Sequence, residues 1–129
     1  MAERIARGPG TSAEKVHALF VEMMESFERH YPAMYVYVED QVRIARQDSE
    51  WAQDVTESSR RFQDVVVRLL KNGQSDGSIR RDLPPELTAR ALFGMVNWTH
   101  QWWRPNGKHK AQAIAEVFST IFLDGASAS

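Results

Sequence analysis

The sequence predicts an all-α fold, a bundle of five helices. Apolar side chains recur at the i, i+3, i+4, i+7 spacing of one helix face in successive segments. Proline, glycine and polar loops separate these segments. A chain of 129 residues is long enough to form one domain with a buried core.

The first helix is predicted to begin near Ser12. Thr11 and Glu14 have the spacing of a capping box, in which both side chains bind free backbone N–H groups. Apolar residues between positions 16 and 27 form one wide stripe. The helix is expected to end before Pro32, because proline disfavours helical geometry at the residue that precedes it.

The second helix is predicted to begin around Pro32, since proline is accommodated in a first helical turn. Residues 35–38 alternate like a short strand, but their flanks favour a helix. The third and longest helix is expected to be capped by Asp48 or Ser49 and to end at residues 72–73. Its predicted apolar face consists of Trp51, Val55, Phe62, Val66, Leu69 and Leu70.

Two further helices are predicted after the polar loop 73–82. The fourth runs over residues 85–104 and the fifth over residues 108–124, with the Arg-Pro-Asn-Gly stretch 104–107 between them. We expect residues 1–10 to be the remnant of a connecting helix and its linker, and residues 126–129 to be a frayed tail. The folded domain is accordingly expected to span residues 11–125.

The fourth helix has large apolar groups on nearly every side, including three tryptophans within six residues. Such a helix must be covered on all sides, which predicts a second subunit on one face. Gly94 costs about 1 kcal/mol relative to alanine, so close approach of another helix is expected to offset it. Tight packing inside one subunit is the alternative. The residues predicted at a homodimer interface are Gly94, Trp98, Gln101, Trp102, Ile114, Phe118 and Ile121.

Methionine and aromatic side chains along the first four helices predict a pocket for a small hydrophobic ligand. These groups form adaptable walls, and pockets in bundles occur between helices. Core packing alone would produce a similar pattern. The residues predicted to contact a ligand are Phe20, Met24, Phe27, Tyr35, Phe62, Val66, Met95, Asn97 and Thr99.

Several functional classes are disfavoured. The net charge of −1 and sequence pI of about 6.4 give no basic face for nucleic acid. The chain has no cysteine, no stretch apolar enough to span a membrane and no recognisable catalytic motif. Glu14 and His17 match half of a di-iron site, but no second Glu-x-x-His follows. We therefore expect a soluble cytoplasmic protein that is not an enzyme and holds no metal or cofactor.

The second half of the chain carries a resemblance to a known family. The stretches concerned are residues 69–70, Gly73, 77–84, 91–99, 102–107 and 114–125. They resemble the C-terminal regulatory domain of tetracycline-repressor-like (TetR) transcriptional regulators, in the branch that often senses fatty-acyl or steroid-derived coenzyme A thioesters.

This resemblance implies an effector-sensing domain of a repressor that dimerises through its last two helices and releases DNA when the effector binds. We expect the N-terminal helix-turn-helix domain of such regulators to be missing, so that operator DNA is bound only through that missing domain. The alternative is a freestanding helical module that binds lipid or another protein and has no DNA partner.

Overall fold

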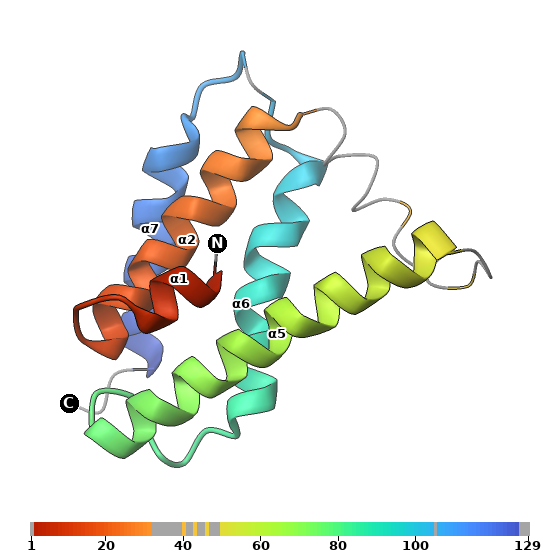
Figure 1. Cartoon of the computed structure of the whole chain (residues 1–129). Coiled ribbons are helices and arrows are strands. Elements are labelled where there is room, and N and C mark those ends of the chain that lie inside the picture. Colours follow the sequence, from red (N-terminus) through yellow and green to blue (C-terminus); the bar gives the residue numbers. More distant parts are fainter. Residues whose placement is uncertain are drawn as a thin grey trace.

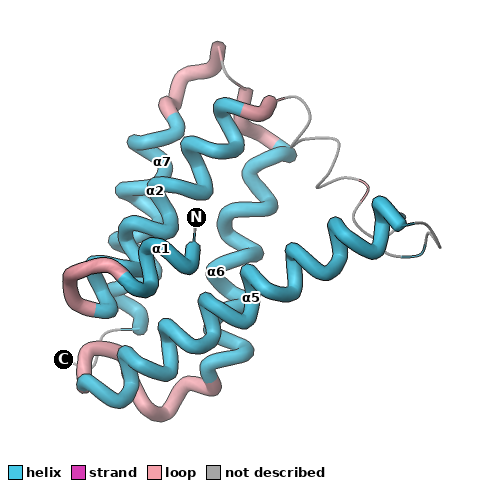
Figure 2. The backbone as a smooth tube through the Cα atoms, in the orientation of Figure 1, coloured by secondary structure: helices cyan, strands magenta, loops and turns pink. Residues whose placement is uncertain are grey.

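The computed structural model describes residues 2–31, 40, 43, 46, 50–104 and 106–126. Its helices are α1 (Ala2–Arg7), α2 (Ser12–Arg29), α5 (Glu50–Asp76), α6 (Pro85–Asn97), the 3-10 helix η1 (Trp98–Gln101) and α7 (Ala111–Ala126). Turns and loops separate α1 from α2 and α5 from α6 (Figure 2). The predicted all-α fold class is confirmed. The helix predicted from Pro32, the candidate ligand residue Tyr35 and the side chains of Trp51 and Val55 lie outside what the structure describes.

The helices pack around α2. The most extensive helix pair is α2 with α7, which run side by side, while α5 crosses in front of α6 (Figure 1). Helix α2 also contacts α5 and α6, and the short α1 lies against α2 and α5. Residues from all four long helices therefore meet in one hydrophobic core.

Helix α2 begins where the sequence predicts. The backbone N–H of Glu14 donates to the Thr11 hydroxyl at 3.1 Å, and the backbone N–H of Thr11 donates to the Glu14 carboxylate at 3.3 Å. This capping box satisfies two N–H groups that the first turn leaves without helical partners. The apolar stripe of α2 is buried from Val16 to Phe27.

Helix α5 continues past the predicted end at residues 72–73. Gly73 lies inside the helix and is buried, and a methyl group there would overlap the side chain of Ile79. The chain turns instead at Gly77, whose φ of 89° is a left-handed conformation that glycine adopts without strain. The predicted stop was wrong because Gly73 leaves room for a returning side chain rather than ending the helix.

The predicted fourth helix is also different. The α-helical part ends at Asn97 and η1 follows it to Gln101, so residues 102–104 are not helical. The backbone N–H of Trp103 donates to the carbonyl of Thr99 at 2.8 Å, which turns the chain back toward the molecule. Trp103 is thereby only 2% exposed.

Helix α7 begins three residues later than predicted. The backbone N–H of Gly107 donates to the carbonyl of Arg104 at 2.9 Å, and neither residue is helical. The first helical bond joins the N–H of Ile114 to the carbonyl of Lys110 at 3.1 Å. Among the described residues, no helix is both long and apolar enough to cross a membrane.

Candidate ligand-binding core and dimer face

The residues predicted to contact a ligand occupy the core and its edge. Phe20, Met24 and Phe27 of α2, Val66 of α5 and Thr99 of η1 are buried. Phe62 of α5 and Met95 and Asn97 of α6 are half-buried. Every apolar member of this described set belongs to, or packs against, one hydrophobic cluster.

Aromatic contacts join three of these residues to other core side chains. The ring pairs are Phe20 with Phe122 at 5.5 Å, Phe27 with Trp103 at 5.6 Å, and Phe62 with Phe93 at 5.6 Å. Edge-to-face and tilted pairs at such separations stabilise a core. These three residues therefore have a packing role, and their part in ligand binding stays a prediction.

Thr99 is the polar side chain buried deepest in this region. Its hydroxyl donates to the carbonyl of Val96 at 2.7 Å, so its burial leaves no donor unsatisfied. The oxygen of that hydroxyl has remaining capacity to accept a hydrogen bond. This geometry is compatible with the predicted polar contact between Thr99 and a ligand.

Trp103 is a core residue that the sequence reasoning did not single out. Its ring contacts Phe27 and Tyr31, and its indole N–H donates to the carbonyl of His109 at 2.8 Å. The sequence contained no signal that separates Trp103 from Trp98 and Trp102, because η1 changes the helical phase just before it. The buried indole fixes the connection between η1 and α7 to the end of α2.

Several large apolar side chains of α6, η1, the turn after η1 and α7 are exposed. The large hydrophobic residues exposed in the described structure all belong to this region. They are Leu87, Trp98, Trp102, Val117 and Ile121, with exposed fractions between 47% and 63%. We call this set the outer apolar face. The rings of Trp102 and Phe118, 6.4 Å apart, join its two halves.

The predicted interface residues divide into two groups. Trp98, Trp102, Ile121 and Gln101 are exposed, and Phe118 is half-buried beside Trp102. Ile114 is only 5% exposed, so its predicted exposure was wrong. Helical phase does not account for this difference, because Ile114 lies seven residues before the exposed Ile121, on the same side of α7.

Gly94 is exposed on α6, and a methyl group added there would meet no atom within 4 Å. Within the described residues, this glycine therefore does not permit tight packing inside one chain. Leu87 and Val117 belong to the outer apolar face but were missed by sequence reasoning. Leu87 lies seven residues before Gly94, and Val117 lies four before Ile121, spacings that place each pair on one helix face.

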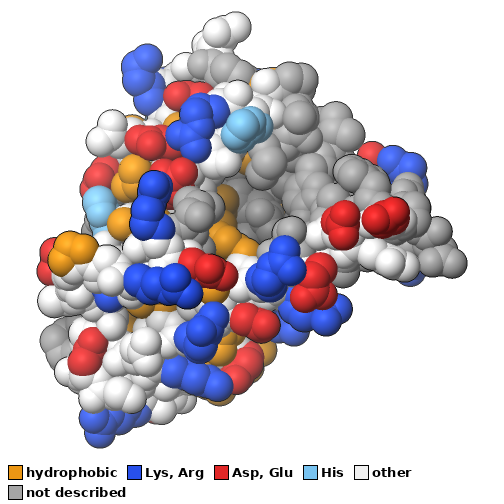
Figure 3. Space-filling view, in the orientation of Figure 1, with side chains coloured by type: hydrophobic (Ala, Val, Ile, Leu, Met, Phe, Trp, Pro, Cys, Tyr) orange, Lys and Arg blue, Asp and Glu red, His pale blue; other side chains and the backbone are white. Residues whose placement is uncertain are grey.

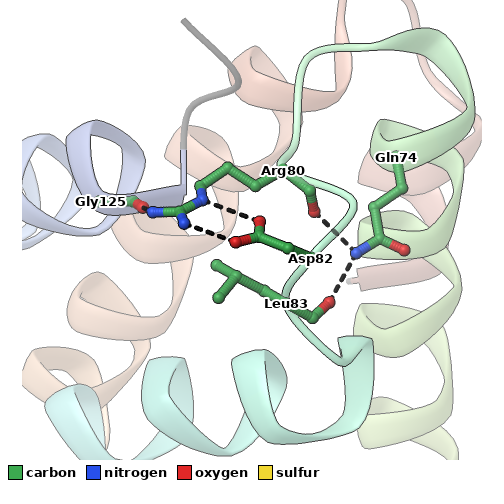
Figure 4. Close-up of polar contacts among 5 residues, drawn as sticks. All are labelled: Gln74, Arg80, Asp82, Leu83 and Gly125. Atoms are coloured by element: carbon green, nitrogen blue, oxygen red, sulfur yellow. Dashed lines mark hydrogen bonds and ion pairs between the residues drawn. The ribbon is translucent and has the colours of Figure 1, made fainter.

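The connection between α5 and α6 is closed by hydrogen bonds (Figure 4). The amide of Gln74 donates to the carbonyls of Arg80 at 2.8 Å and Leu83 at 2.7 Å. The guanidinium of Arg80 forms two bonds to Asp82, at 3.0 and 2.6 Å, and a third to the carbonyl of Gly125 at 3.4 Å. These contacts attach the loop to α5 and to the end of α7.

Hydrogen bonding in this connection shifts three ionisable groups. The bond from Arg80 lowers the pKa of Asp82 and raises the pKa of the Arg80 guanidinium. The hydroxyl and backbone N–H of Ser78, followed by the hydroxyl of Ser12, lower the pKa of Asp76. Asp76 thereby links the beginning of α2 to the end of α5, with the Ser12 hydroxyl 2.8 Å away.

The remaining charged groups of the described structure form neither a metal-ligand cluster nor a surface of one charge sign on the face shown in Figure 3. His17 of α2 pairs with Glu116 of α7 at 2.9 Å on the surface. No group of three potential metal ligands occurs among the described residues. Basic and acidic side chains are interspersed over α5 in the face shown in Figure 3. That face is therefore not the single-signed surface that duplex DNA requires.

These features describe a helical domain with an aromatic core and an uncovered apolar face on its last two helices. Residues 9–126 match the profile of the family described as "Tetracyclin repressor-like, C-terminal domain". The chain belongs to this family of transcriptional regulator domains.

Individual relatives agree with this assignment. The HTH-type transcriptional repressor KstR2 of Mycobacterium tuberculosis is 26% identical over 113 residues, covering 87% of this chain and 55% of the repressor. The chain thus spans about half the length of this curated relative.

Two solved structures share the fold. The ketosteroid transcriptional regulator KstR2 of Mycobacterium tuberculosis has a TM-score of 0.84 and 24% identity, covering 98% of this chain and 63% of that one. AibR, solved in complex with isovaleryl coenzyme A and operator DNA, has a TM-score of 0.73 and 16% identity, covering 90% of this chain and 61% of that one.

Proposed function

We propose that this chain is the effector-sensing and dimerisation domain of a cytoplasmic TetR-family repressor. It binds a small hydrophobic effector, such as an acyl coenzyme A or a steroid-derived coenzyme A thioester. Operator DNA is bound by a separate N-terminal helix-turn-helix domain, and effector binding releases that DNA. The chain's own role is binding, not catalysis.

The observation that carries the proposal is the outer apolar face. Large hydrophobic groups such as Trp98 of η1 and Ile121 of α7 are each at least 60% exposed, and the chain belongs to a family of transcriptional regulator domains. Contiguous apolar surface of this kind marks an interaction site, and a twofold dimer covers the same patch on both copies. We therefore propose a homodimer formed through α6 and α7.

Two relatives support the class of effector. KstR2 is described as a ketosteroid regulator, and AibR was solved with isovaleryl coenzyme A. The first description points to a polycyclic apolar ligand, and the second to a short branched acyl group carried on coenzyme A. In this chain the buried residues Phe27, Val66 and Thr99 would supply an apolar wall and one hydroxyl for such a ligand.

Sedimentation at micromolar concentration tests the dimer. The expected mass is twice the 14.8 kDa of the chain. Gly94→Leu places a bulky side chain in the centre of the outer apolar face and is expected to weaken association. Gln63→Leu adds a similar side chain to the exposed surface of α5 and serves as the control. A monomeric wild type, or normal association of Gly94→Leu, would contradict the proposed interface.

Thermal unfolding with long-chain acyl and steroid thioesters tests the effector. A ligand that binds only the folded state stabilises it by about 2.7 kcal/mol at a hundredfold excess over Kd. Val66→Phe and Thr99→Leu are expected to abolish this shift while the ligand-free protein remains folded, because a real cavity accepts added carbon. In a close-packed core each substitution would instead cost about 1 to 3 kcal/mol.

The absence of any acyl or steroid-induced shift, together with destabilisation of both variants, would favour the freestanding interaction module. The DNA role is tested separately. We expect the 129 residues alone to show only weak, salt-suppressed binding to duplex DNA. In an intact regulator the effector and the operator should weaken each other's binding by the same factor.

A further inference from the structure

The charge of the chain is unevenly distributed. Four of the 16 Lys and Arg residues, and none of the 17 Asp and Glu residues, lie between positions 87 and 115. That segment carries a formal charge of +4, whereas the rest of the chain carries −5. The overall charge of −1 therefore conceals a local excess of cations.

Three of these cations, Arg104, Lys108 and Lys110, are exposed in the connection between η1 and α7. We call these three residues the basic loop. Lys108 and Lys110 form no ion pair within the described part of the chain. By contrast, Arg29, Lys71 and Arg80 each pair with a carboxylate.

The backbone of the basic loop is held in a defined position. The buried indole of Trp103 donates to the carbonyl of His109, the residue between the two lysines. The N–H of Gly107 donates to the carbonyl of Arg104. The Trp103 ring also packs on Phe27, which places the basic loop at the same end of the molecule as the end of α2 (Figure 1).

The stability of the fold does not account for these lysines. They precede the first turn of α7, where the helix dipole favours acidic side chains and where serine or aspartate would cap free N–H groups. A lysine ammonium has no lone pair with which to cap an N–H group. An anionic ligand would offset the unfavourable electrostatics of this arrangement.

We propose that the basic loop binds the phosphate groups of a coenzyme A thioester, whose acyl part enters the core beside Phe27. This inference rests on the proposed effector-sensing function. Coenzyme A carries several phosphate charges joined by a flexible arm to the thioester. A site for the whole molecule needs cations near the apolar residues that contact the acyl group. The buried Trp103 provides this proximity, because its indole N–H bonds to the carbonyl of His109, between Lys108 and Lys110, while its ring packs on Phe27.

Calorimetric titration with free coenzyme A and with isovaleryl coenzyme A tests the proposal on the 129-residue chain. The loop variant combines Lys108→Ala with Lys110→Ser. The matched control combines Arg68→Ala with Lys71→Ala on the exposed surface of α5, which removes the same charge. Because the Lys110→Ser side chain is a good helix cap, the loop variant should melt no lower than wild type.

The loop variant is expected to bind both probes about five to ten times more weakly, since exposed ion pairs contribute up to about a fivefold factor each. Its affinity should also depend less on salt. The control should bind as wild type does. Equal affinity of the loop variant and wild type, or no binding of free coenzyme A by wild type, would overturn the inference.

A further ligand distinguishes this failure from failure of the proposed function. If palmitic acid raises the melting temperature while coenzyme A is not bound, the sensing function stands and the phosphate site is rejected. If duplex DNA is retained at physiological salt only when both lysines are present, and coenzyme A is not bound, the phosphate site is likewise rejected.

Discussion

The two connections that flank α6 use their charged residues differently. In the α5–α6 connection, residues 77–84, Arg80 binds Asp82 and also donates to the carbonyl of Gly125 at the end of α7. In the η1–α7 connection, residues 102–110, Lys108 and Lys110 have no described ion pair, and a buried tryptophan holds the chain in place.

This difference separates charge used for folding from charge available for binding. The α5–α6 connection is joined to the rest of the molecule by polar contacts, and within it Arg80 and Asp82 neutralise each other. The η1–α7 connection is joined by an apolar anchor, and its two lysines, Lys108 and Lys110, form no ion pair within the described part of the chain. Substitutions in the two connections should therefore affect stability by different mechanisms and to different extents.

The largest expected effect is the loss of the anchor. Trp103→Ala should lower the free energy of unfolding by about 3 to 5 kcal/mol, because it removes a buried ring and its hydrogen bond to His109. Urea unfolding measures the change. Trp98→Ala removes the same side chain from the exposed face and should cost the folded monomer far less. Equal losses would show that Trp103 does not anchor the η1–α7 connection.

Two glycines in helices should respond to alanine in opposite directions. Gly73→Ala should destabilise by about 1 to 3 kcal/mol, because the methyl group would overlap Ile79 of the returning loop. Gly94→Ala meets open space and should stabilise the monomer by up to about 1 kcal/mol. Thermal unfolding compares the pair. If both variants are more stable than wild type, Ile79 shifts easily and its contact with Gly73 does not prevent a larger residue at position 73.

The polar contacts of the α5–α6 connection are tested at Gln74. Gln74→Ala removes hydrogen bonds to two loop carbonyls and should cost about 1 kcal/mol, since water compensates part of the loss. Gln63→Ala removes an exposed amide from the same helix and should change stability by less than about 0.5 kcal/mol. If unfolding in urea gives the two variants equal stability, the loop does not depend on Gln74.

The smallest expected effect is a change in stability at acidic pH, caused by Asp76. Because the folded-state pKa of Asp76 is lowered, its contribution is fully present above the unfolded value of about 3.9 and is lost as the pH falls through the folded value. The melting temperature should therefore decline less steeply below about pH 4 in Asp76→Asn than in wild type. Asp64→Asn, on the exposed face of α5, is the control. If the melting temperature of Asp76→Asn declines as steeply as that of wild type, Asp76 does not contribute to the loss of stability in acid.

The local sequence was sufficient for the fold class and for much of each helix. Thr11 and Glu14 predicted the beginning of α2, and its buried stripe followed from residue spacing. Val66, Leu69 and Leu70 were correctly placed on the inward face of α5. These features depend on residues within about one helical turn of each other, so the sequence alone carries the information.

Helix ends and burial within the second half were harder to predict. Gly73 looked like a helix stop because glycine often ends helices, but Ile79 requires the space above it. The burial of Ile114 was missed because its side of α7 is also that of the exposed Ile121, and only packing in the hydrophobic core separates the two residues. In both cases the deciding neighbour belongs to another segment of the chain.

The sequence by itself determined that the chain is helical, where α2 begins and that the second half carries an excess of cations. Only the tertiary structure decided that Trp103 is buried while Trp98 and Trp102 are exposed, and that Lys108 and Lys110 lie near the end of α2. Helix periodicity and capping arise from interactions between residues close in the sequence. Burial instead depends on which distant segments pack together, here α2 and the connection that follows η1.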